Sequence, residues 1–288
     1  MSTEPLTHDH KLNFVQSLAD DLSKGSIELP SFPDVVIRLR QILEDENSTT
    51  PQIVQLLTAE PVLAARLIQM ANSAALRGVT SEMTDLSAVV NRLGRNMVRN
   101  SAMAYAMKQM RETQKLESAQ SYLEELWNDS THLAALCYVL AKKLTKLNPE
   151  QALLVGLLHG IGKLYILAQA EDHPELFEDT AHLSEILDGW HAAIGSAILE
   201  AWNFPEEVSG SVAKYQETGR EHDGQTDLTD ILIVAHLLGA FLRQDSDAEL
   251  QLENVPAAKH LAISASELGG VLHQAEEQIA ALRSALGK

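Results

Sequence analysis

The sequence has little cysteine, few aromatic residues and few of the residues that make tight turns. Cys137 is the sole cysteine among 288 residues, so no internal disulfide can form, and this usage favours a reducing cytoplasm. It lies in the apolar helical run "HLAALCYVLA", where we expect a buried rather than a reactive thiol. Aromatic residues make up 5% of the chain, and nine prolines and fifteen glycines are few for this length. These scarcities disfavour a sheet protein with many turns.

Basic residues are also scarce. Lys and Arg number 22 against 40 Asp and Glu, which gives a formal net charge of −18. Such a charge opposes general attraction to DNA, RNA or anionic lipid, and it suits a basic protein partner. The polar, acidic start "MSTEPLTHDHKLNF" does not resemble a signal peptide, and we find no apolar run approaching about 18 residues. We therefore expect a cytoplasmic protein that neither crosses a membrane nor binds DNA.

The residues that remain are mostly helix formers, and they predict an all-α fold. Thr50, followed by a proline, is expected to cap one helix. That helix should end near Thr58, and the next should begin at Pro61, because proline is a poor residue for a helix interior. Two further helices should meet at Gly94, and Asn148 should cap another helix that has proline in its first turn.

Composition changes along the chain predict four segments. A polar stretch near residue 116 separates two helical lobes, and a polar loop precedes the last helix. That helix has apolar residues at alternating spacings of four and three, a narrow seam that could pack on its own chain or join two copies in a homodimer. The segments are an N-terminal extension (1–26), an N-terminal helical lobe (27–116), a second helical lobe (117–245) and a loop with the C-terminal helix (246–288).

Six stretches in a characteristic order resemble the HDOD family, a bacterial helical module related to the HD metal phosphohydrolases. They run from about residue 27 to 243, and they include "LPSFPDVVIRLRQILED", "LLTAEPVLAARLIQMANSA", "AVVNRLGRNMV", "LWNDSTHLAALC", "ALLVGLLHGIGKLYIL" and "EILDGWHAAIGSAILEAWNFPEEV". The resemblance implies a two-lobed fold, with an N-terminal helical bundle and a C-terminal HD-like bundle. It also implies a role in signalling, since members of the family commonly lack the catalytic ligands.

The ligand pattern of the HD relatives is incomplete in this sequence. The resemblance places Asp129 where the first histidine would stand, and Gly160 follows His159 where the aspartate of the His-Asp pair would stand. His191 matches the later histidine, and His236 replaces the closing aspartate. The paired histidines found in relatives correspond to Lys214 and Tyr215, and the lysine would bring a positive charge to the place of a cation.

Two interpretations of the remaining residues stay open. Asp129, His159, His191 and His236 could be the remnant of a metal site, now a buried hydrogen-bonded cluster without catalytic residues. Alternatively, two or three histidines with one carboxylate could still bind a divalent metal ion, as in a divergent phosphohydrolase. We expect the first, and hence no metal and no other cofactor.

Basic residues gather in one place despite the overall charge. Arg92, Arg95 and Arg99 would lie along one helix face, and they are candidates for binding a signalling nucleotide or an acidic partner surface. The remaining histidines stand in polar or terminal contexts and are expected at the surface. They are His8, His10, His173, His182, His222, His260 and His273.

The sequence thus predicts a non-catalytic HDOD regulatory module that acts by binding a protein partner, with a signalling nucleotide as a further possible ligand. The alternative function is that of a divergent metal-dependent phosphohydrolase of the HD superfamily. These two hypotheses differ in whether His159 and His191 coordinate a metal ion.

Overall fold

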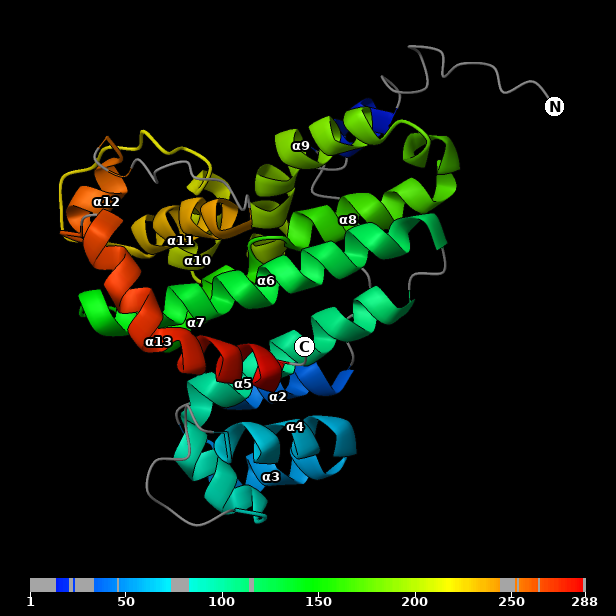
Figure 1. Ribbon diagram of the computed structural model, residues 1–288. Helices are drawn as coiled ribbons and strands as arrows, with labels where there is room; N and C mark the ends of the chain where they lie inside the picture. The colour runs from blue at the N-terminus through cyan, green and yellow to red at the C-terminus, as the bar shows by residue number, and fades with distance from the viewer. Residues whose placement is uncertain are drawn as a thin grey trace.

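The regular structure of the chain is helical. The computed structural model describes residues 14–20, 23, 34–45, 47–73, 83–113, 117–243, 252, 254–263 and 265–286. In these ranges helices follow one another and no strand occurs, so the predicted all-α class is confirmed. Figure 1 shows a smaller group of helices from the N-terminal part beneath a larger body, which agrees with the two-lobed arrangement.

The smaller group packs around apolar side chains that recur at helical spacing. Leu39 of the first helix, Leu57 of the second and Leu67 of the third are fully buried. The fourth and longest helix contacts the other three. These helices are α2 (Asp34–Glu44), α3 (Thr50–Thr58), α4 (Pro61–Ala71) and α5 (Leu86–Thr113).

The larger body surrounds one central helix, α6. Residues 133–141 of α6 are all buried, including Cys137 as predicted, so this stretch has no solvent-facing side. It contacts three other helices of the body, α7, α8 and α11. The helices of this body are α6 (Glu117–Leu144), α7 (Pro149–Leu158), α8 (Ile161–Gln169), α9 (Thr180–Ala201), α10 (Glu206–Lys214) and α11 (Leu228–Arg243), with short 3-10 turns η1 (Ala170–Asp172) and η2 (Pro174–Phe177).

The last helix, α13 (Ala265–Leu286), follows the short α12 (Pro256–His260) and connects the two groups. It packs against α6 and also contacts α4 and α5, and Figure 1 shows it crossing between the two parts. Leu268, Ala275 and Leu282 of its apolar seam are buried. The seam thus packs on its own chain, whereas pairing with a second copy stays a prediction.

Most predicted helix boundaries agree with the structure. Pro61 begins α4, Asn148 caps α7 through its side chain, and Gly94 (φ 75°, ψ 163°) divides α5 into two helices. The predicted cap Thr50 is wrong by one residue. The N-cap of α3 is Thr49, because its backbone N–H and hydroxyl both contact the Gln52 side chain in a capping box.

Two other predictions concern segment limits and membranes. The predicted boundaries near residues 116 and 245 lie outside the described residues. One helical stretch, Pro149–Asp172, has the length and hydropathy of a membrane span, contrary to the expectation that no run approaches this length. In its apolar window of 18 residues, 83% is buried inside the protein, where the stretch includes α7 and α8. Such burial is typical of a core helix pair.

Candidate functional site

His159 lies at the break between α7 and α8, as the "GLLHGIGK" stretch suggests. It is the C-cap residue of α7, and Gly160 is the N-cap residue of α8. The imidazole is 6% exposed, and its Nδ1 lies 2.7 Å from the carbonyl oxygen of Gly156. Because a carbonyl can only accept, Nδ1 carries the hydrogen of this bond.

His191, in the middle of α9, is fully buried and has partners on both ring nitrogens. Its Nδ1 lies 2.5 Å from the carbonyl oxygen of Leu187, one turn earlier, and therefore donates. Its Nε2 contacts the hydroxyl of Tyr215, which follows α10. In the neutral imidazole, Nε2 is then the acceptor and the tyrosine hydroxyl the donor. The Nε2 lone pair of His191 is thus occupied by a protein group.

Tyr215 fills the space between the histidines. Its ring is 1% exposed and meets three imidazoles edge to face, with centroid distances of 5.6 Å to His159, 5.7 Å to His191 and 5.0 Å to His236. The structure therefore brings the three predicted histidines together around a phenol. Lys214 is exposed rather than inside this cluster, so the expected positive charge at the cation position does not come from it.

Burial keeps the cluster neutral. Desolvation lowers the pKa of His159 to about 3 and that of His191 to about 4, and neighbouring imidazoles and Lys163 act in the same direction. Desolvation also raises the pKa of Tyr215, with further contributions from Asp188 and Asp129. At neutral pH His159 and His191 are therefore neutral and Tyr215 keeps its phenol proton.

Asp129 lines a small pocket beside the cluster. The pocket has a volume of about 140 Å³, and His159, Lys163 and Asp188 also line it. Lys163 and Asp188 form an ion pair at 2.9 Å. Glu125 also lines the pocket, so one ammonium stands there with three carboxylates, those of Glu125, Asp129 and Asp188, and the lining is acidic overall.

The residues present do not fit the metal ion of the HD relatives. Asp129, His159, His191 and His236, all in the described part of the chain, do not bring three ligand atoms close enough together to share one ion. At Gly160 a Cβ would lie 2.5 Å from Cδ1 of Leu126, the end of a flexible side chain that would have to shift. An aspartate at this position would have to displace that leucine. We therefore derive no reaction step through a metal at this cluster.

Two of the three arginines, Arg92 and Arg95, donate hydrogen bonds to backbone carbonyls. Arg95 donates to the carbonyl oxygens of Ile42, Leu43, Asp45 and Ser48 at 2.7–3.2 Å, where α2 ends. It thus satisfies carbonyls that the helix end leaves without partners. Arg92 donates to the carbonyl of Ala71 at 3.4 Å, and burial lowers the pKa of Arg99. Arg95 therefore serves to close the turn between α2 and α3.

Comparison with known proteins agrees with this fold. A family model of the HDOD domain matches residues 29–218. An uncharacterized protein of Treponema pallidum (strain Nichols) is 25% identical over 253 residues, which are 83% of this chain. The chain spans 47% of the length of that relative.

Solved structures give the same result. A candidate metal-dependent phosphohydrolase from Shewanella amazonensis SB2B has a TM-score of 0.80 at 24% identity, covering 96% of this chain and 99% of its own. An HDOD domain protein of unknown function from Geobacter sulfurreducens scores 0.64 at 20% identity, with 98% and 99% covered. A candidate signal transduction protein from Marinobacter aquaeolei VT8 scores 0.62 at 16% identity, with 100% and 68% covered. At these identities the likeness shows the fold.

Proposed function

Because this chain belongs to the HDOD family, we propose that it is a non-catalytic signal-transduction module that acts by binding a protein partner. The observation that carries the proposal is the packing of Tyr215 among His159, His191 and His236. A hydrolytic metal ion needs ligand lone pairs that point to one position, with open positions for water and phosphate. The tyrosine ring takes up that space, and its hydroxyl uses the Nε2 lone pair of His191.

The charges near the cluster support the same proposal. No carboxylate stands next to His159 in the chain, since Gly160 has no side chain. Lys163, paired with Asp188, supplies a positive charge close to both buried histidines and lowers the pKa of each. The net charge of −18 favours a partner whose contact surface is basic.

The decisive test is a screen for phosphodiesterase, phosphatase and nucleotidase turnover with Mn²⁺, Mg²⁺, Fe²⁺ and Ni²⁺ added in turn. We expect no turnover above that of a matched control, the double variant His159→Ala/His191→Ala. Metal-dependent turnover by the wild type that this double variant loses would overturn the proposal and favour the divergent phosphohydrolase. The variant His273→Ala, changed at a side chain that is 89% exposed, tests whether such a loss is specific to the cluster.

Partner binding calls for a second measurement. A partner found by crosslinking is purified and titrated against the wild type and against the His159→Ala/His191→Ala variant. We expect equal affinity for both proteins, falling as salt is raised, because the attraction is between surface charges. If the double variant binds the partner more weakly than the wild type does, the Tyr215 cluster takes part in binding, which would contradict a purely structural role.

A further inference from the structure

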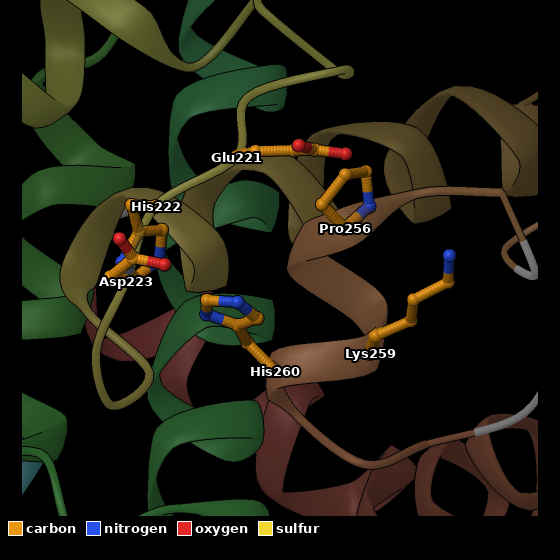
Figure 2. Close-up of a pocket in the computed structure, with 6 residues that line it drawn as sticks. All are labelled: Glu221, His222, Asp223, Pro256, Lys259 and His260. Atoms are coloured by element: carbon orange, nitrogen blue, oxygen red, sulfur yellow. The ribbon is translucent and has the colours of Figure 1, made fainter.

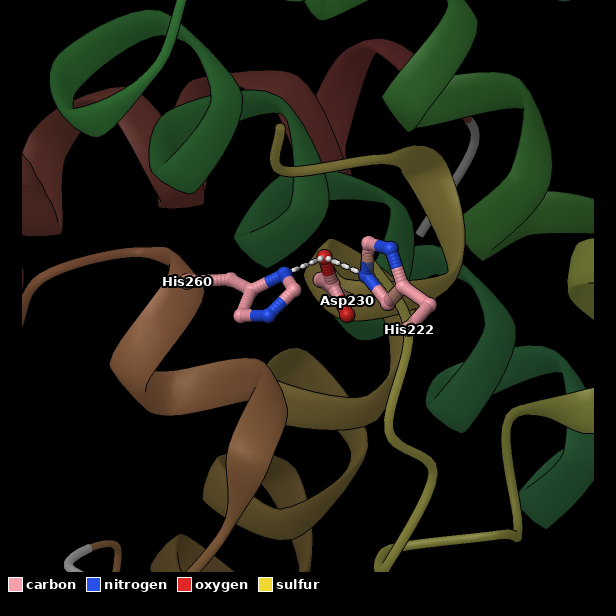
Figure 3. Close-up of side chains that lie close together, drawn as sticks. All are labelled: His222, Asp230 and His260. Atoms are coloured by element: carbon pink, nitrogen blue, oxygen red, sulfur yellow. Dashed lines mark hydrogen bonds and ion pairs between the residues drawn. The ribbon is translucent and has the colours of Figure 1, made fainter. Parts of the chain in front are cut away.

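Three side chains from separate segments meet at the N-terminal end of α11. Two of them are histidines for which the sequence suggests surface positions. His222 lies in the loop after α10, Asp230 in the first turn of α11, and His260 at the end of α12. His222 Nε2 lies 3.0 Å and His260 Nδ1 lies 3.2 Å from the same oxygen, Oδ2 of Asp230 (Figure 3). The three ligand atoms all lie within 4.8 Å of one another.

The two distances from Oδ2 of Asp230 are close to those between ligands of one metal ion. With metal–ligand bonds of about 2.0–2.1 Å, two ligand atoms of a tetrahedral ion lie about 3.3 Å apart. Two imidazoles and one carboxylate are a recognised ligand set for divalent transition metals, and they leave coordination positions open. Small movements of His222 and His260 would therefore suffice to place an ion between the three side chains.

Hydrogen bonds from Arg220 and from the backbone of Asp227 hold the Asp230 carboxylate in place. The side chain of Asp230 is 1% exposed, and its Oδ1 accepts a hydrogen bond from Arg220 at 3.2 Å. Arg220 also binds Asp227, whose backbone N–H donates to Oδ2 of Asp230 at 3.1 Å. Such hydrogen bonds to a ligating carboxylate are a common feature of metal sites, because they fix its orientation.

The local charge favours a cation. Asp227 and Asp230 carry two negative charges and Arg220 carries one positive charge, so with neutral imidazoles one negative charge is left over. Oδ2 of Asp230 also has more neighbours than lone pairs, since one backbone N–H and two imidazoles point to it. A single cation bound by all three side chains would relieve this crowding.

The cluster borders a pocket through which an ion could enter. The pocket has a volume of about 470 Å³, and the side chains of His222 and His260 are 19% and 21% exposed. In Figure 2 the two imidazoles lie close together on one side of the pocket, while Lys259 extends away from them. The residues that line the pocket are Glu221, His222, Asp223, Pro256, Lys259 and His260.

We propose that His222, Asp230 and His260 bind a divalent transition-metal ion of the zinc, cobalt or nickel kind. The ion would join the loop after α10 and the end of α12 to the start of α11. This site is separate from the Tyr215 cluster, because Asp230 and His236 stand six residues apart on α11, about 9 Å along its axis. It does not depend on the proposed function.

The test is a titration of chelator-treated full-length protein with Co²⁺, followed by its visible absorption and by equilibrium dialysis, with Zn²⁺ as competitor. We expect one equivalent of Co²⁺ to bind, and Zn²⁺ to displace it. His222→Ala and His260→Ala should each weaken binding about tenfold or more, because each removes one of three ligands. Arg220→Gln should weaken it about 10–100-fold by releasing the carboxylate. His273→Ala, on the exposed face of α13, should bind as the wild type does.

Several outcomes would overturn the inference. One is wild-type protein that binds no Co²⁺ or Zn²⁺; another is equal binding by the wild type, His222→Ala and His260→Ala, with circular dichroism showing that both variants are folded. A third is loss of binding in His159→Ala and His191→Ala but not in His222→Ala and His260→Ala. That third result would place the ion in the Tyr215 cluster and would also contradict the proposed function, whereas the first two would leave the proposed function intact.

Discussion

Two buried histidines make the stability of this protein depend on pH. Folding lowers the pKa of His159 to about 3 and that of His191 to about 4, mainly because both imidazoles are desolvated. Above the ordinary histidine pKa of about 6.5, both residues are neutral in the folded and unfolded states. Below it, the unfolded chain binds protons that the folded protein does not bind, so the free energy of unfolding falls as pH falls from about 6.5 towards 4.

We expect these two histidines to lower the free energy of unfolding by about 4 kcal/mol between pH 7 and pH 5, or about 2 kcal/mol each. Urea unfolding at the two pH values measures this loss. In His191→Gln the decrease in the free energy of unfolding between pH 7 and pH 5 should be about half as large, because glutamine does not titrate. Glutamine can still accept a hydrogen bond from the Tyr215 hydroxyl. The exposed His273→Gln is the control, and it should behave as the wild type. Equal pH dependence in wild type and His191→Gln would contradict the prediction.

At the residue scale, the sequence could predict identities but not environments. The missing aspartate after His159 and the tyrosine at position 215 are visible in the sequence by comparison with the HD pattern. That the Tyr215 ring would lie between three imidazoles depends on how α9, α10 and α11 pack, and no local pattern encodes this. His222 and His260 were expected at the surface because their neighbours are polar, yet both contact a buried aspartate 8 and 30 residues away.

Helix contacts explain the glycines of the "GLLHGIGK" stretch. Gly162, in the first turn of α8, lies against α9 so closely that a Cβ would be 2.0 Å from the carbonyl oxygen of His191 and 2.8 Å from the nitrogen of Gly195. Both neighbours are backbone atoms, so they can give way only if a helix moves. Gly162 thus permits the close approach of α8 and α9 that also positions His191.

Gly162→Ala should therefore destabilise the protein by about 3 kcal/mol or more, because α8 and α9 must separate. The matched control is Gly189→Ala in α9, an exposed position where a Cβ would meet nothing within 4 Å. There alanine should stabilise the helix by about 0.5–1 kcal/mol. Urea midpoints of the two variants give the comparison. Equal effects of the two substitutions would show that the α8–α9 contact is not tight.

Element boundaries were predictable where local chemistry sets them. Pro61, Gly94 and Asn148 act on the backbone of their own helices, and each stands where the sequence predicted. Arg95 was less predictable. Its charge suggested a ligand, but its partners are carbonyls about 50 residues earlier in the chain, at the end of α2.

At the scale of the whole molecule, α13 contacts both groups of helices, and α5 of the smaller group also contacts α7 of the larger body directly. Helix α13 packs against α6 of the larger body and against α4 and α5 of the smaller group. Its buried face includes Leu282, which is fully buried, whereas Glu277 on the same helix is exposed.

Leu282→Ala should lower the free energy of unfolding by about 2–5 kcal/mol, because it leaves a cavity where α13 packs on its own chain. Glu277→Ala should change it by no more than about 0.5 kcal/mol. Urea unfolding measures both, and amide hydrogen exchange should become faster in α13 of the leucine variant. A leucine variant as stable as the glutamate variant would mean that α13 adds little to the packed structure.

The position of α13 in the chain also determines the order of assembly during translation. The faces of α4 and α6 that it covers are synthesised long before it, and α13 follows α11 by more than 20 residues. At roughly 5–20 residues per second, a ribosome needs a few seconds to add this last stretch. During that interval the apolar faces of α4 and α6 that α13 covers stay exposed on the nascent protein, and the docking of α13 ends this exposure.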